Sequence, residues 1–141
     1  MNTLTLQMQS LASALAAAYP QRIVTRNWED SSQRSDSDLA RGIFTLIGKS
    51  ESDYADYPGR EAQLGTLQFV VIAQIKVAEG SGASAVEDAE GDLIDEIKAF
   101  ASNPPPSLAE AGNLALTGWQ QSGQLEHPYG WVAFRFEWYL S

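Results

Sequence analysis

Hydrophobic and polar positions alternate strictly through residues 129–140. This period of two predicts a β-strand with one buried face. We therefore expect the last strand to lie in the core of the protein, with a mixed aromatic and charged set on its other face. The first face comprises Val132, Phe134, Phe136, Trp138 and Leu140, and the second comprises Trp131, Ala133, Arg135, Glu137 and Tyr139.

A second long strand is predicted over residues 64–78. One of its faces is apolar throughout, whereas the other is apolar only in the middle, at Val70 and Ile72, between Gln68, Gln74 and Lys76. A sheet built on these two strands should have one fully covered face and a second face covered in part. A further helix or a neighbouring subunit could supply that partial cover.

A period of three to four predicts a helix over residues 4–18, capped by Thr3 or Thr5 and ended by Pro20. The pattern predicts a second helix from Ser84, where Ser84 and Glu87 would form a capping box.

Three prolines at 104–106 should end this second helix. Asp88 and Glu90 would favour the positive end of its dipole. Its apolar stripe is Val86, Ala89, Leu93, Ile94, Ile97 and Phe100, and its exposed stripe is Asp88, Asp92, Asp95 and Glu96.

Shorter strands are predicted over residues 21–28, 39–48 and 114–121, with a polar loop or hairpin tip at 29–38 and a long polar loop at 49–63. Strands that alternate with two helices indicate an α+β fold. We expect a mixed, mostly antiparallel sheet of about five strands, packed with two main helices in a single domain over residues 1–141.

The chain has 141 residues and a net charge of −9, and residues 61–141 hold eleven acidic residues but only three basic ones. Such a surface repels phosphate backbones, so we expect no sequence-specific binding of nucleic acid. The absence of cysteine excludes disulfides, zinc–thiolate sites and thiol catalysis. We expect no membrane segment and no secretory signal, and predict that the protein works in the cytoplasm.

Candidate catalytic groups are few and have no supporting pattern. Gly48-Lys49-Ser50 resembles the end of a phosphate-binding loop, but the required first glycine is replaced by Ile43, so we interpret this segment as the end of a strand. His127, the only histidine, lies in a turn signal and is interpreted as a solvated loop residue.

Two acidic groups, Asp36 with Asp38 and Asp53 with Asp56, lack the spacing of a calcium loop. We therefore expect no catalytic residue, no cofactor and no metal, and predict that the protein is not an enzyme. A small enzyme or ligand-binding domain that uses His127 and loop carboxylates remains the less favoured alternative.

Aromatic residues and arginines are the best candidates for contact with another protein, because such residues are enriched at interfaces. One group is Trp131, Arg135 and Tyr139, on the less apolar face of the last strand; these could equally be covered core residues. A second group lies in the long loop and comprises Tyr54, Tyr57 and Arg60.

The order of these segments resembles the tail terminator, or tail completion, proteins of long-tailed phages and prophages (minor tail protein U-like). The resemblance covers the whole chain and comprises an Ala/Leu-rich first helix, the strand LQFVVIAQIKV, the acidic helix AVEDAEGDLIDEI, a GWxxxG segment from Gly118 and the closing strand WVAFRFEWY.

The resemblance implies a structural protein without a cofactor that forms a ring, sixfold in the family. The ring would cap the tail tube and join it to the head side. Its partners would be other copies of itself, the tail tube protein and head-side connector proteins, first in the host cytoplasm and then in the virion tail. A different head–tail connector or a tube-like component of the virion is an open alternative.

Overall fold

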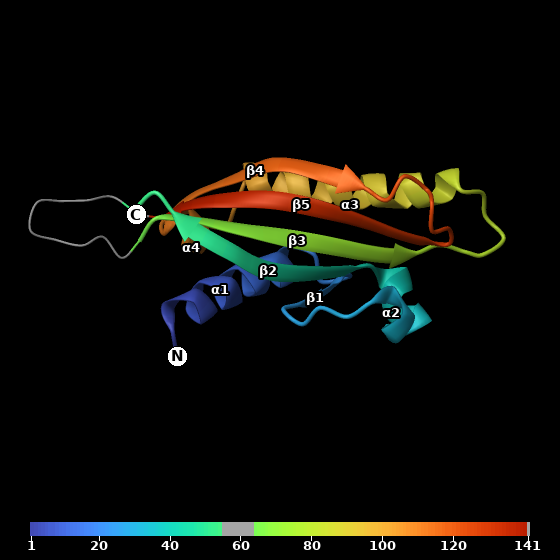
Figure 1. Ribbon diagram of the computed structural model, residues 1–141, viewed down its shortest axis with the longest axis horizontal. Coiled ribbons are helices and arrows are strands. Elements are labelled where there is room, and N and C mark those ends of the chain that lie inside the picture. The colour runs from blue at the N-terminus through green and yellow to red at the C-terminus, as the bar shows by residue number, and fades with distance from the viewer. Residues whose placement is uncertain (55–63, 141) are drawn as a thin grey trace, which may run out of the picture.

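The computed structural model describes residues 1–54 and 64–140. In chain order the elements are helix α1 (Thr3–Ala18), strand β1 (Ile23–Thr25), the 3-10 helix η1 (Ser31–Gln33), helix α2 (Asp36–Arg41), strands β2 (Ile43–Ser52) and β3 (Thr66–Lys76), helices α3 (Ser84–Ser102) and α4 (Pro106–Ala109), and strands β4 (Gly112–Gln121) and β5 (Tyr129–Leu140) (Figure 1).

The five strands form one mixed sheet in the order β1-β2-β3-β5-β4. The short β1 runs parallel to β2, and every other neighbouring pair is antiparallel. The α+β class, the five strands and the two main helices, α1 and α3, confirm the prediction. The closing strand spans the predicted residues 129–140 and lies between β3 and β4, so it is an interior strand of the sheet.

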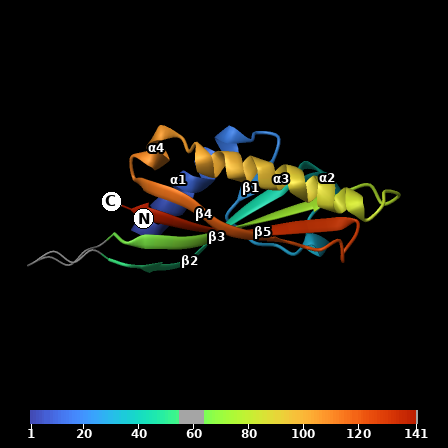
Figure 2. The ribbon, with the colours of Figure 1, turned by 90° about the horizontal axis from the view of Figure 1, so that it is seen from above.

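One face of the sheet is covered by α1 and α3, which lie on the same side of it (Figure 2). Apolar side chains from both helices meet the inward residues of β3 and β5 in one buried cluster. At its centre the Phe69 and Phe136 rings stack with centroids 5.0 Å apart. The alternating pattern of the last strand is confirmed, since Val132, Phe134, Phe136 and Trp138 are all buried.

The other face of the sheet is covered only at one end, by the segment that contains η1 and α2. Gln74 Nε2 donates to the Glu29 carbonyl and to Ser31 Oγ, both at 3.1 Å. Lys76 Nζ lies 3.0 Å from the Asp36 carboxylate. The predicted partial cover is thus supplied by a short helical segment of the same chain, and no other described residues cover the remainder of this face.

Several predicted boundaries are wrong. Residues 29–38 form no hairpin tip, because β1 and β2 are parallel and η1 and the start of α2 occupy this stretch. Leu39 lies buried in α2, and β2 begins only at Ile43. Gly48-Lys49-Ser50 is not a strand end either. It lies inside β2, at a bulge between Gly48 and Ser50, and the strand continues to Ser52.

The predicted helix caps are also wrong. Asn2 caps α1 through its side chain, which accepts from the Thr5 amide at 2.7 Å. Helix α3 begins at Ser84, and its cap residue, Ala83, makes no side-chain hydrogen bond. The prolines do end α3, whose last residue is Ser102. No helix in the described part of the chain is both long and apolar enough to cross a membrane.

Glu90 lies on the buried face of α3. The prediction for this residue was only that its negative charge favours the positive end of the helix dipole. Its carboxylate accepts hydrogen bonds from Ser122 Oγ at 2.5 Å, from the Trp131 amide at 2.9 Å and from Gln121 Nε2 at 3.3 Å. A side chain at Gly130 would collide with it, since a Cβ there would be 2.8 Å from Oε2. Glu90 therefore fastens α3 to the connection between β4 and β5.

Replacing Glu90 tests this role. We expect Glu90→Ala to lower the free energy of unfolding by about 2–4 kcal/mol, because it leaves buried donors without an acceptor. Glu90→Gln keeps an acceptor oxygen and should cost only about 1 kcal/mol. Urea denaturation measures both values. Equal stability of the alanine variant and the parent protein would show that the hydrogen bonds accepted by Glu90 contribute nothing to the free energy of unfolding.

Candidate functional site

The uncovered part of the second sheet face, which we call the open sheet face, is the main candidate site. Residues that are paired across the neighbouring strands β2, β3, β5 and β4 lie side by side on this face. The middle of the face is apolar and half-buried, and its far end is polar. The residues that form it are Ile47, Val70, Ile72, Trp131, Ala133, Arg135, Glu137 and Tyr139.

The structure places Trp131, Arg135 and Tyr139 on the same face of β5, as the alternation predicts, with Trp131 beside Gln74 at the covered end and Tyr139 at the far end. Arg135 is exposed and forms no ion pair with any described residue. Its guanidinium lies over Gly118, where a Cβ would collide with it. The Tyr139 ring is 43% exposed. An apolar centre flanked by an unpaired arginine and an exposed tyrosine has the composition of a protein interface.

Tyr139 donates its hydroxyl hydrogen to the Glu137 carboxylate on the same face. This hydrogen bond, aided by burial and by the charges of Glu137 and Asp53, raises the pKa of Tyr139. At the same end of the sheet Tyr54 is 46% exposed, and the nearby Glu51 carboxylate raises its pKa. Glu51 lies opposite Leu67, whose buried side chain is on the helix-covered face, so this contact does not place Tyr54 on the open sheet face.

Two other predicted interface residues, Tyr57 and Arg60, lie outside the described residues.

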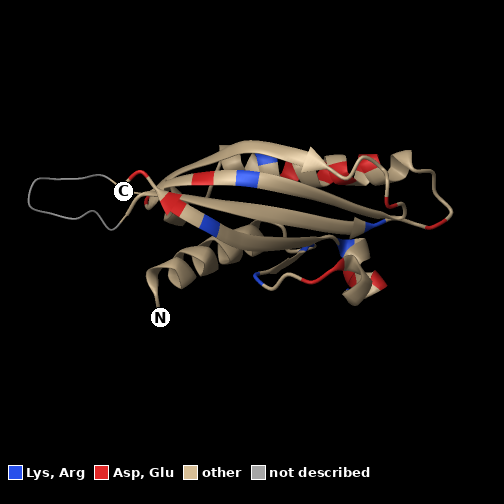
Figure 3. Cartoon of the chain, viewed as in Figure 1, with Lys and Arg blue, Asp and Glu red and all other residues tan. Residues whose placement is uncertain are grey.

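The acidic residues gather on α3, on the opposite side of the sheet from the open face (Figure 3). Asp88, Asp92 and Asp95 are exposed, as predicted. The prediction is wrong for Glu96, which is half-buried and accepts a bidentate pair of hydrogen bonds from Arg22 at 3.0 and 2.6 Å. Glu96 thus joins α3 to the segment that precedes β1, and it does not belong to the free acidic surface.

The groups considered for catalysis or metal binding lie apart. Ser81 Oγ is 3.4 Å from His127 Nε2, but this hydroxyl donates to the Ala78 carbonyl at 2.5 Å. Asp36 is engaged by Lys76, and the interaction with Asp36 raises the pKa of Lys76. Within residues 1–54 and 64–140, no three acidic or histidine side chains are grouped as they would be around a metal ion.

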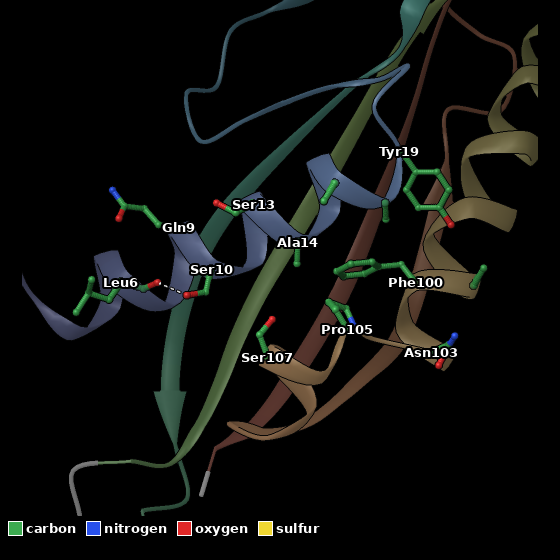
Figure 4. A pocket seen from close by; sticks show the side chains of 13 residues that line it. Leu6, Gln9, Ser10, Ser13, Ala14, Tyr19, Phe100, Asn103, Pro105 and Ser107 are labelled. Carbon is green, nitrogen blue, oxygen red and sulfur yellow. Dashed lines mark hydrogen bonds between the residues drawn. The ribbon is translucent and has the colours of Figure 1, made fainter.

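A groove of about 960 Å³ runs along the helical side of the molecule, between α1 and the junction of α3 and α4 (Figure 4). Small residues of α1, such as Ala14 and Ala17, form one wall, and Phe100 and Pro105 form the other. Sequence reasoning missed this groove because only tertiary packing brings the two walls together. The available signal was the run of alanine and serine on one side of the first helix.

Neither a protein-family model nor a curated protein matches this chain.

The Tyr139–Glu137 contact provides a test of the geometry of the open sheet face. Because the carboxylate holds the phenol in its protonated form, Glu137→Gln should lower the pKa of Tyr139 toward 10.0, its ordinary value. The measurement is the NMR titration of ring-labelled tyrosine, with Tyr54 as the internal reference. An unchanged Tyr139 titration would show that the two side chains do not interact in solution.

Proposed function

We propose that this protein is a structural component of a phage or prophage tail, and that it acts as the terminator, a ring that caps the tail tube and forms the attachment surface for the head. The open sheet face is the observation that carries the proposal. It combines an apolar centre with the exposed Tyr139 and with Arg135, which forms no ion pair with any described residue, and Trp131 lies at its edge beside the covered Gln74.

The order of elements also supports a terminator. A first helix, a long central strand, an acidic helix and a closing interior strand occur in the sequence that the resemblance requires. The mixed sheet with both main helices on one side leaves the other side available to another protein. A protein that acts through its surfaces needs no reactive group.

The acidic surface of α3 suggests how DNA would pass through such a ring. Exposed carboxylates repel phosphate, so a lumen lined by Asp88, Asp92 and Asp95 would let DNA slide without sticking. In this proposal the helical side of each subunit faces the lumen, and the open sheet face contacts another component of the tail.

Light scattering together with electron microscopy over a concentration range, with and without tail tubes, tests the terminator proposal. We expect closed rings of fixed stoichiometry, either free or on tube tips, and capped tubes that stop growing. Indefinite polymerisation of the protein alone would instead favour a tube component. A protein that forms no ring and caps no tube over the whole range would contradict the proposal.

A charge reversal distinguishes the open sheet face from the rest of the surface in the same assay. Arg135→Glu should abolish capping of the tube while leaving the unfolding transition nearly unchanged, because Arg135 is exposed and has no ion pair among the described residues. The matched control is Arg26→Glu, at an exposed arginine outside this face. Equal capping by the two variants would remove the open sheet face from the mechanism.

A second prediction concerns the lumen. The double variant Asp92→Lys with Asp95→Lys should make the assembled ring bind double-stranded DNA at low salt, with binding lost as salt is raised. Glu96 stays unchanged because reversing it would break its pair with Arg22. The control, Asp38→Lys with Glu110→Lys, has the same net charge at positions outside α3, the first half-buried and the second exposed. Equal DNA binding by both double variants, measured by fluorescence anisotropy, would show that α3 does not face the DNA.

A further inference from the structure

Leu125 is the most exposed large apolar side chain among the described residues, at 88%, and it lies at the tip of the connection between β4 and β5. Gln124 Nε2 donates to the Glu87 carboxylate at 2.9 Å, and the Tyr129 amide donates to the Glu126 carbonyl at 2.9 Å. Gln124 also has a φ of +67°, a left-handed conformation that costs a non-glycine residue about 1 kcal/mol. The loop thus holds Leu125 outward in a defined conformation.

The groove between α1 and the α3–α4 junction is the matching feature. None of the described residues that line it is charged, although 19% of the residues in the chain are charged. Phe100 and Pro105 point from one wall toward Ala14 on the other (Figure 4). An uncharged, open groove of about 960 Å³ has room for a leucine and its flanking backbone.

The Leu125 loop cannot fill the groove of its own molecule. The loop is tied to α3 at Glu87, near the start of the helix, whereas Phe100 lies thirteen residues further along. At ~1.5 Å per residue these points are about 20 Å apart along the helix axis. The two features therefore lie toward opposite ends of α3, and the loop that enters the groove must come from another molecule.

We propose that Leu125 of one copy inserts into the groove of the next copy. The contact joins two different surfaces, so it is head-to-tail, and a head-to-tail contact closes into a ring when its rotation permits. The inference rests on the proposed function and deepens it by naming the contact that builds the ring.

The proposed contact is small, and this has a consequence for assembly. One leucine with its flanking residues buries far less surface than a stable dimer requires, so isolated subunits associate weakly. Closing the ring adds a last contact within the assembly, at high effective concentration, which makes formation of the ring cooperative. Open oligomers that have not closed into a ring should therefore be rare relative to monomers and complete rings.

Cysteine cross-linking tests the contact directly, because the natural chain contains no cysteine. The single variants Leu125→Cys and Ala17→Cys, both at exposed positions, are mixed under mild oxidation. We expect disulfide-linked dimers to form at least about tenfold faster than in a control mixture of Trp28→Cys and Ala17→Cys, since Trp28 is exposed but lies outside both surfaces. Equal rates in the two mixtures would overturn the inference, whether or not rings form.

A second variant measures the contribution of the leucine. Leu125→Ser should reduce the association constant of the head-to-tail contact about tenfold to a hundredfold, the loss expected from exposing one leucine, with an unchanged unfolding transition. Full ring assembly by this variant would overturn the inference and leave the terminator proposal intact. The opposite outcome would be specific cross-links in open oligomers that never close into a ring and never cap a tube. That result would show that the contact exists and that the proposed function is wrong.

Discussion

The packing of two helices against one face of the sheet is the constraint on which the rest of this structure depends. Alternate residues of β3 and β5 face α1 and α3, and apolar contact between these layers supplies the main stabilising energy. Because both main helices lie on the same side, the opposite face is left to the short η1–α2 segment, which covers only one end. An open sheet face is therefore a direct consequence of where the helices pack.

Polar contacts then set how the layers are joined. Glu90 fastens the start of α3 to the β4–β5 connection, and the bidentate pair of Glu96 with Arg22 fastens its second half to the segment before β1. Both carboxylates belong to a helix that also carries Glu87, which accepts a hydrogen bond from Gln124, and the exposed Asp88, Asp92 and Asp95. The same run of acidic residues thus serves two purposes, since two of them orient the helix and the exposed ones give it a negative surface.

These features place three separate surfaces on one small protein. The open sheet face carries the aromatic and arginine residues, the exposed side of α3 carries the negative charge, and the two ends of α3 carry the Leu125 loop and the groove. In the proposed terminator they would contact a tail component, face the DNA and join neighbouring subunits, respectively. Separation of the three surfaces would let a ring do all three at once.

The sequence by itself determined the fold class, the long strands and the aromatic set on β5, because strict alternation over twelve residues has only one structural meaning. It misplaced shorter features. Leu39 was predicted in a strand because a local window cannot distinguish a buried turn of helix from a buried strand. Glu96 was predicted to be exposed because its partner, Arg22, lies 74 positions away in the chain. Only the tertiary structure decided which acids are buried, which face stays open and where the groove lies, since each depends on segments that are distant in the chain and meet only after folding.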